Sequence, residues 1–478
     1  MESVFDQRPT VYEDFELSLR SELASMKLPP SDISCNYSAD YLKFFPLLSV
    51  RDPYNPIEFI INSDSNSYLD LSDSFMHVVA RVRKGDDSVV DDNTVCPSNL
   101  FFQLMIKNVE IYINSVLIYD SSNYYAHIAY LQRLLTTTDD VKLTELKNEL
   151  FYPDKVVESY TANSEGFKKR TTFANGSHQF TMLGRIVAGI FNQKSWLPPG
   201  TQVRIVMRRN PPDFCLDSTA VEDTGSAGAK IKRVFKYELD EVSFLVSRKP
   251  VSGRIMELHR SLLEKNHTFK FVTNESYVKT IQVPRGMTSV VADNIIMGPI
   301  PKIIVIGCVK SSAMVGSLTE SPMNFAHSNL KQINLSWNAD TVENRVVPLN
   351  FSTTSNTIPD NFLLGLQSLK KAAPDGKLSI SRDEYKNGKL FIIIISYTSN
   401  TDNEAYTLIF VCLTGNCLVA FELLPVMNDA LSINRRGSVK LSLEYRESTT
   451  VPLTVIIYCM YQRVIEIDAN RNVLLDSQ

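Results

Sequence analysis

The sequence has few of the features that mark an enzyme or a metalloprotein. Its six histidines stand singly among 478 residues, without an H-x-x-H or H-E-x-x-H pair, so a zinc site would need ligands that converge from distant parts of the chain. It has no G-x-x-x-x-G-K-[ST] phosphate loop and no G-x-S-x-G nucleophile turn. Aspartate pairs at 86–87, 91–92 and 139–140 indicate solvated turns, with weak cation binding as the alternative. We therefore expect no catalytic residue, no cofactor and no metal ion.

The cysteines do not form a disulfide framework pattern. There are seven, an odd number spread over the whole chain, and several lie in apolar runs such as those around Cys308 and Cys459. Cysteines in such runs are typically buried free thiols, which are poor nucleophiles. This usage predicts a reducing compartment.

Strong charge and long apolar runs are also missing. The formal net charge is -4, and the basic clusters at 168–170, 208–209 and 435–436 are short, so we interpret them as solvated loops and strand ends and predict no direct sequence-specific nucleic-acid contact. The best candidate for a membrane span, Leu408–Leu424, is interrupted by Thr414–Asn416, which indicates a hairpin turn. The first residues are acidic and lack an apolar stretch, so we expect no signal peptide and no membrane span.

What is present is organised around a short helical connector, Val251–Asn266. Ile255, Leu258, Leu262 and Leu263 recur at helical spacing, Ser252 is a candidate cap, and Asn266 is a candidate stop. Long strand-rich tracts lie on both sides of it. The connector therefore predicts a chain of two β-domains.

The first tract contains several apolar runs of strand length and one amphipathic helix. An arm precedes it, with a possible helix at Val11–Met26. The helix is expected at Ser122–Leu135 with Ser122 as its cap, and a turn is expected at Asn114-Ser115. Tyr124, Tyr125 and Tyr130 are expected in the core, with a subunit contact as the alternative. We expect a long polar loop at Thr136–Asn175 and strands at Ile57–Ile61, Tyr68–Leu71, Met76–Val82, Leu104–Val109, Glu110–Tyr119, Gln179–Gly184, Ile186–Phe191, Thr201–Arg208 and Val234–Val246.

The second tract follows the same order of strands, hairpin, helix, long loop and strands. Its turn is expected at Asn338–Asp340 and its helix at Asp360–Lys371. Expected strands are Val278–Val283, Ile303–Val309, Leu330–Trp337, Leu390–Tyr397, Tyr406–Leu413, Cys417–Leu424, Val439–Arg446 and Val451–Ile467. The parallel in order favours a duplicated β-domain.

Many short strands without βαβ alternation favour antiparallel sandwiches, and the jelly roll is the variant that best tolerates long insertions. The expected fold class is all-β: a double jelly roll of two eight-stranded antiparallel β-sandwich domains with a few short helices in loops. The expected division is an N-terminal arm at 1–45, a first jelly roll at 46–249, a helical connector at 250–268 and a second jelly roll at 269–478.

Several blocks of the sequence, in order along the chain, resemble the major capsid proteins of Polinton/Maverick elements and their adintovirus relatives. The opening blocks are Lys27–Pro30, Pro56–Ile60, Ser67–Leu71 and His77–Val82, and the later ones are Pro198–Ile205, Asp213–Leu216, Ile300–Gly307, Asn324-Phe325, Asn329-Leu330, Val464–Asp468 and Asn470–Leu474.

The resemblance implies a major capsid protein with two upright jelly rolls per subunit. It implies a homotrimer that forms a pseudo-hexagonal capsomer of an icosahedral shell, belonging to a double-stranded DNA virus or a virus-like Polinton element. Implied partners are neighbouring capsomers, a single-jelly-roll penton protein and internal cement proteins. The implied location is the virion, with assembly in the cytoplasm or nucleus of the host cell.

Other classes of function use the same architecture. A carbohydrate- or peptide-binding double β-sandwich would be a stable monomer with a concave ligand site. An enzyme of the cupin type would need clustered histidine and carboxylate ligands, which the sequence lacks. A chromosomal copy that forms no virions would keep the fold with a host role that differs.

Overall fold

The computed structural model describes residues 40–91, 93–154, 164–219, 222–224, 230–232, 234–325, 328, 330–337, 390–391, 394–398, 405–413, 416–422 and 436–475. The helices expected at Val11–Met26 and Asp360–Lys371 and the turn expected at Asn338–Asp340 lie outside these residues.

The first half of the chain forms two four-stranded antiparallel sheets. One has the order β1 (Asp40–Phe44), β12 (Phe235–Pro250), β3 (Ser67–Lys84), β7 (Phe180–Gly184), and the other has the order β2 (Ile57–Asn62), β8 (Gln202–Arg209), β5 (Ile106–Ile113), β6 (Val116–Asp120). β1 lies inside the range expected for the arm, and its pairing with β12 adds it to the sheet. These eight strands make the first roll.

Helices and short strand pairs fill the connections of the first half. The helices are α1 (Phe101–Leu104), α2 (Tyr125–Thr136), α3 (Asp139–Leu143), η2 (Glu145–Glu149), α4 (Glu165–Ala174), η3 (Asn175–Ser177), α5 (Gly189–Asn192) and α6 (Pro212–Cys215). The short strands are β4 (Val95–Pro97) paired with β9 (Leu216–Ser218), and β10 (Glu222–Thr224) paired with β11 (Lys230–Lys232).

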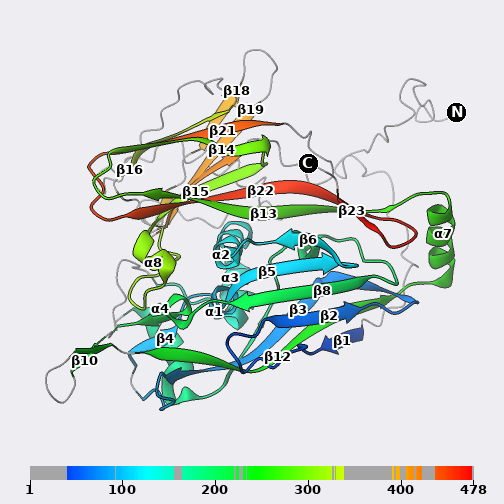
Figure 1. Ribbon diagram of the computed structural model, residues 1–478, viewed down its shortest axis with the longest axis horizontal. Coiled ribbons are helices and arrows are strands. Elements are labelled where there is room, and N and C mark those ends of the chain that lie inside the picture. Colours follow the sequence, from blue (N-terminus) through cyan, green and yellow to red (C-terminus); the bar gives the residue numbers. More distant parts are fainter. Residues whose placement is uncertain are drawn as a thin grey trace.

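The second half also forms two antiparallel sheets, reached through α7 (Gly253–Glu264). The larger has eight strands: β13 (Phe269–Val283), β22 (Leu453–Ile467), β15 (Ile303–Lys310), β20 (Asn416–Glu422), β19 (Ala405–Leu413), β17 (Leu390–Phe391), β18 (Ile394–Thr398) and β23 (Val473–Leu475). The smaller consists of β14 (Ser289–Pro299), β21 (Arg436–Tyr445) and β16 (Leu330–Trp337), and α8 (Ser311–Val315) follows β15. Figure 1 shows the second half stacked over the first, with α7 at one end.

Alternation of apolar and polar residues explains why these segments are strands. In β2, Ile57, Phe59 and Ile61 are fully buried, while Glu58 and Ile60 between them are partly exposed. Burial of each such apolar side chain stabilises the fold by roughly 1.5–3 kcal/mol. At the Asn114-Ser115 turn both residues have positive φ, 47° and 69°, which matches the right-handed twist of the β5–β6 hairpin.

The two halves share one continuous apolar core. The cluster that holds Phe59, Ile111 and Tyr125 of the first half also holds Phe271 and Tyr458 of the second. A separate cluster, including Ile304, Leu441 and Val455, lies between the two sheets of the second half. We call the layer between β5, β6 and α2 on one side and β13 and β22 on the other the seam (Figure 1).

The structure corrects three expected elements. Tyr68–Leu71 and Met76–Val82 belong to one strand, β3, because a register shift opposite Val246 and Ser247 absorbs residues 71–73 without ending the pairing. Ile186–Phe191 is not a strand but contains α5, since a short apolar run suits a buried helix equally well. α2 starts at Tyr125, and Ser122 has a φ of 52° in the preceding turn, where it caps nothing.

The long loop and the connector also differ from expectation. Thr136–Asn175, expected to hold little pattern beyond residues 145–150, contains α3 and α4 besides η2. The connector helix is confirmed as α7, and Asn266 ends it with a φ of 63°. However, none of its residues is buried: Leu258 and Leu262, two of the apolar residues that recur at helical spacing, are 55% and 37% exposed.

Candidate assembly surfaces

The seam is crossed by hydrogen bonds as well as apolar contacts. The Tyr119 hydroxyl in β6 donates to the Ser276 carbonyl oxygen in β13 over 3.2 Å. Arg463 Nη1 in β22 donates to the Ile118 carbonyl oxygen over 3.1 Å, and Asn114 Nδ2 donates to the Arg471 carbonyl oxygen over 2.7 Å. The Tyr124 hydroxyl lies 3.3 Å from Thr280 Oγ1. These bonds fix the alignment of the two halves, because hydrogen bonds are directional and apolar contacts are not.

A carboxyl group is buried at the seam. Glu275 in β13 is 1% exposed, its Oε1 accepts from Thr273 Oγ1 over 3.2 Å, and its Oε2 has no hydrogen-bond partner among the described residues. Burial raises the pKa of Glu275 to about 7, and the nearby cation Arg463 opposes that rise. The rings of Tyr119 and Tyr277 lie against each other beside it, with centroids 6.0 Å apart. The seam therefore contains a group that changes charge near neutral pH.

A buried ion cluster holds the long loop of the first half in place. Arg170 in α4 is fully buried, and its Nη2 lies 2.8 Å from Asp154 Oδ2 and 3.1 Å from Asp217 Oδ2. Its Nε donates to the Pro97 carbonyl oxygen over 2.9 Å. The expectation that the cluster at 168–170 is solvated is therefore wrong for Arg170, because two carboxylates replace its water.

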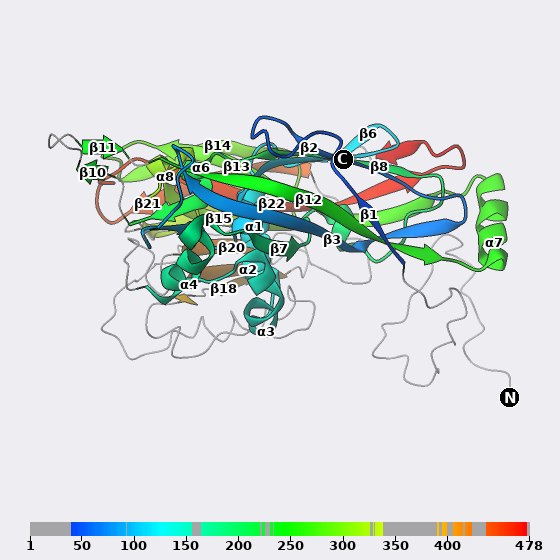
Figure 2. The ribbon, with the colours of Figure 1, turned by 90° about the horizontal axis from the view of Figure 1, so that it is seen from below.

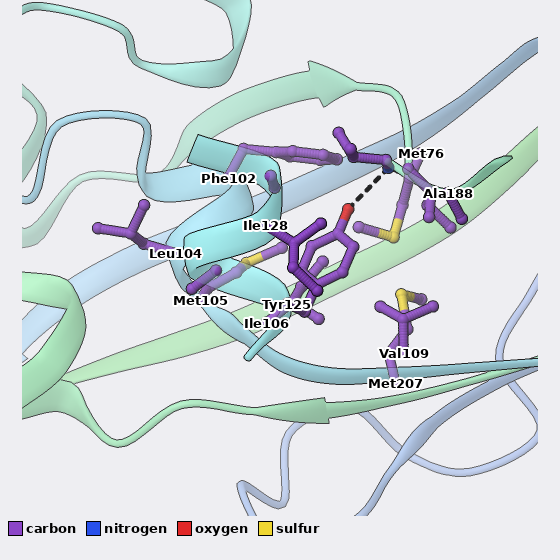
Figure 3. Close-up of a cluster of buried hydrophobic side chains, with 14 of the residues drawn as sticks. Met76, Phe102, Leu104, Met105, Ile106, Val109, Tyr125, Ile128, Ala188 and Met207 are labelled. Carbon is purple, nitrogen blue, oxygen red and sulfur yellow. Dashed lines mark hydrogen bonds between the residues drawn. The ribbon is translucent and has the colours of Figure 1, made fainter. Parts of the chain in front are cut away.

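A second polar network lies under α2. The Tyr125 hydroxyl donates to Gln103 Oε1 over 2.7 Å and accepts from the Val187 backbone N–H over 2.9 Å, and Figure 3 shows this ring surrounded by Met76, Ile128 and Ala188. Gln103 Nε2 donates to Glu149 Oε2 over 2.9 Å, and Arg133 Nη2 lies 2.8 Å from Glu149 Oε1. Burial raises the pKa of Glu149. Tyr125 and Tyr130 are buried, which confirms their expected place in the core, while Tyr124 is partly buried and reaches the seam.

The described cysteines and histidines do not form a reactive site. Cys96, Cys215, Cys308 and Cys459 are buried thiols, and burial raises the pKa of Cys459 to about 12. His127 is buried against Phe214, and burial lowers its pKa to about 4. Within the part of the chain that the structure describes, no group of three or more histidine, cysteine, aspartate or glutamate side chains could hold a metal ion. No described helix is long and apolar enough to span a membrane.

Large apolar side chains are exposed on both halves of the protein. On the first half, Tyr41 and Phe45 are 45% and 59% exposed, and Tyr54 is 94% exposed. On the second half, Val291 and Met297 of β14 are 55% and 72% exposed. β14 is an edge strand of its described sheet, pairing with β21 on one side. Exposed apolar edges of this kind require a cover, because they otherwise promote aggregation.

Arg170, Glu275 and the β14 edge were not expected from the sequence to be special positions. The aspartate partners of Arg170 are 16 and 47 residues away, so no local pattern reports them. Glu275 occupies an inward position of β13, and the alternation in FKFVTNESYV could have indicated this.

Comparison with known proteins identifies the fold. No protein-family model matches the sequence. An uncharacterized protein of Caenorhabditis elegans is 21% identical over 434 residues, which covers 88% of this chain and 93% of that protein.

Three solved structures share the architecture. The structure of the Sputnik virophage matches 100% of this chain and 93% of its own, with a TM-score of 0.61 and 12% identity. The PBCV-1 virus capsid matches 95% and 100%, with a TM-score of 0.54 and 11% identity. The mavirus major capsid protein matches 98% and 97%, with a TM-score of 0.50 and 11% identity. The chain thus has the all-β double jelly-roll fold of viral major capsid proteins, which confirms the expected fold class.

Proposed function

We propose that this chain is a major capsid protein, three copies of which form a pseudo-hexagonal capsomer of an icosahedral shell. The observation that carries the proposal is similarity in fold to capsid proteins over the whole chain, including both rolls and their relative placement. The hydrogen-bonded seam supports it, since a capsomer needs its two rolls held at a fixed angle. The exposed apolar strand β14 also supports it, because a neighbouring subunit would cover that edge.

We further propose that the capsid belongs to a virus-like element of the Polinton/Maverick type. The protein would assemble in the cytoplasm or nucleus of a host cell and then be located in the virion. The sequence blocks of that family support this, and so does the relative in a nematode, which matches 88% of the chain and comes from an animal. Neighbouring capsomers, a single-jelly-roll penton protein and cement proteins are the partners we propose. The protein performs no catalysis in this role, and no sequence-specific nucleic-acid contact is needed.

The decisive test is the mass of the purified protein in solution. A trimer of 54.0 kDa chains would have about three times that mass and, in negative-stain images, a hexagonal outline. A monomer that does not trimerise with rising concentration would contradict the proposal and favour a carbohydrate- or peptide-binding sandwich.

A matched pair of variants locates the subunit contact. The double change Val291→Glu and Met297→Glu places two charges on the exposed face of β14 and is expected to shift the trimer towards monomer, since a buried unpaired charge opposes association. Val89→Glu changes a residue of the loop after β3 that is 52% exposed, close to the exposure of Val291, and is expected to leave the mass unchanged.

A further inference from the structure

The connector helix α7 stands apart from the body of the protein. Figures 1 and 2 show it alone at one end of the molecule, beyond the tips of the long strands. A cavity of about 800 Å³ lies between it and the body. Met256, His259 and Leu263, at helical spacing, face this cavity from α7. A helix whose inner face borders a cavity of this size leaves apolar surface unpacked.

Both rolls contribute to the opposite wall. Tyr68 comes from β3, Phe269 from β13 and Arg471 from the turn between β22 and β23. His259 joins the walls, because its Nδ1 lies 2.7 Å from the Tyr68 hydroxyl and its ring meets Phe269 edge-on at 5.5 Å. Aromatic rings therefore line the cavity, and the contacts of His259 with Tyr68 and Phe269 fix the position of its walls.

One cationic group in this wall has an unused donor. Arg471 lies over the Phe269 ring at 5.9 Å, and its Nη1 is buried without a hydrogen-bond partner among the described residues. Its backbone is fixed from the first half, since Asn114 Nδ2 donates to its carbonyl oxygen. A buried guanidinium donor of this kind is satisfied by a carboxylate. The expected occupant therefore combines aromatic or aliphatic side chains with acidic groups.

A segment of this chain has that chemistry and starts nearby. Residues 11–17, Val-Tyr-Glu-Asp-Phe-Glu-Leu, carry two aromatic and three acidic side chains. Residues 1–26 hold six acidic residues and two arginines, a net charge of 2 − 6 = −4. The cavity lining itself holds two basic residues, Arg260 and Arg471, and two acidic ones, Glu257 and Glu264. Arg260 pairs with Glu264 over 3.5 Å, so Arg471 is the cationic group that an acidic segment would contact. Asp40 pairs with Arg248, just before α7. The 22 residues between positions 17 and 40 span up to roughly 75 Å when extended, so the segment can reach the cavity of its own subunit.

We infer that the cavity under α7 is a binding site for the acidic aromatic segment 11–17 of the same subunit, with a carboxylate of the segment on Arg471 and its aromatic rings beside Phe269 and His259. This inference does not depend on the capsid role, because it concerns a single subunit.

Cross-linking in the full-length chain tests it. With Cys35→Ser in the background, Glu16→Cys is combined with Ser261→Cys on α7 and treated with a short bis-maleimide. Position 88 supplies the control, as Ser88→Cys is exposed beyond the far end of β3. We expect the link between positions 16 and 261, mapped by mass spectrometry, to exceed the control link several-fold and to occur in species of monomer mass under denaturing conditions.

Two further variants test the carboxylate contact. Arg471→Gln is expected to lower the yield of the 16–261 link several-fold, and so is the double change Glu13→Gln and Asp14→Asn, which leaves every described residue intact. Equal yields at positions 261 and 88 would overturn the inference. A link found only in species of dimer mass would also overturn it, by assigning the segment to a second copy of the chain. The mass measurement for the capsomer is independent of all these results.

Discussion

The hydroxyl of Tyr119, at the end of the first half's β5–β6 hairpin, donates a hydrogen bond to the carbonyl oxygen of Ser276 in the second half, 157 residues later. We predict that Tyr119→Phe lowers the free energy of unfolding by about 1 kcal/mol, since it removes one buried hydrogen bond and keeps the ring. Urea denaturation measures this change. Tyr112→Phe is the control, because the Tyr112 hydroxyl binds Glu110 within the first half. An unchanged free energy of unfolding in Tyr119→Phe would contradict a stabilising role for its hydrogen bond across the seam.

Gly189 marks a second point of close contact at the seam. A Cβ at this position would lie 2.7 Å from the Asn274 carbonyl oxygen in β13. We predict that Gly189→Ala destabilises the fold by about 1–3 kcal/mol, because backbone must move to accommodate the methyl group. Gly253→Ala in α7 has no atom within 4 Å of the added carbon and should be nearly neutral. Thermal unfolding of the two variants provides the comparison.

Glu275 predicts a pH dependence of stability. Its pKa is about 7 in the folded protein against an ordinary value of 4.5, so the folded state holds a proton that the unfolded state releases. Its stabilising contribution is complete below pH 4.5 and is lost as the pH rises through 7. Glu275→Gln should therefore flatten this dependence and, at pH 8, exceed the parent in stability by on the order of 3 kcal/mol.

The measurement is urea unfolding at pH 5 and pH 8. Arg463 is the charged group that faces Glu275, and Thr273 and Tyr119 are its polar neighbours. Glu241→Gln, on the exposed side of β12, is the control. Glu241→Gln should keep the pH dependence of the parent protein, whereas Glu275→Gln should reduce it. If Glu275→Gln changes stability between pH 5 and pH 8 as much as Glu241→Gln does, Glu275 is not the pH-sensitive group.

The ion cluster around Arg170 predicts a large loss from one substitution. Arg170→Met leaves Asp154 and Asp217 buried without their cation and should cost about 3–5 kcal/mol. Lys169→Met, next to it on the exposed face of α4, should change stability little. Limited proteolysis within residues 136–175 and denaturation report the difference. Similar behaviour of the two variants would show that the cluster does not hold this segment.

The sequence alone predicts strands well where one face is buried. Ile57–Ile61 and Val439–Arg446 agree with β2 and β21 because their alternation is clear. It fails where short apolar runs permit either state, as at Ile186–Phe191, and where a bulge continues a strand through polar residues, as in β3. It cannot predict the seam or the Arg170 cluster, because their partners are brought together only by the fold. The cavity under α7 depends on how far the helix stands from the body, which no periodicity encodes.

The seam also determines how much the connector contributes to holding the two halves together. α7 joins the two rolls covalently, but none of its residues is buried, whereas the layer between β6 and β13 is apolar and hydrogen-bonded. We therefore expect the covalent link to be dispensable for holding the halves together. A chain cut within α7 should remain one particle, melt in a single calorimetric transition, and reassemble from its two fragments when they are expressed separately.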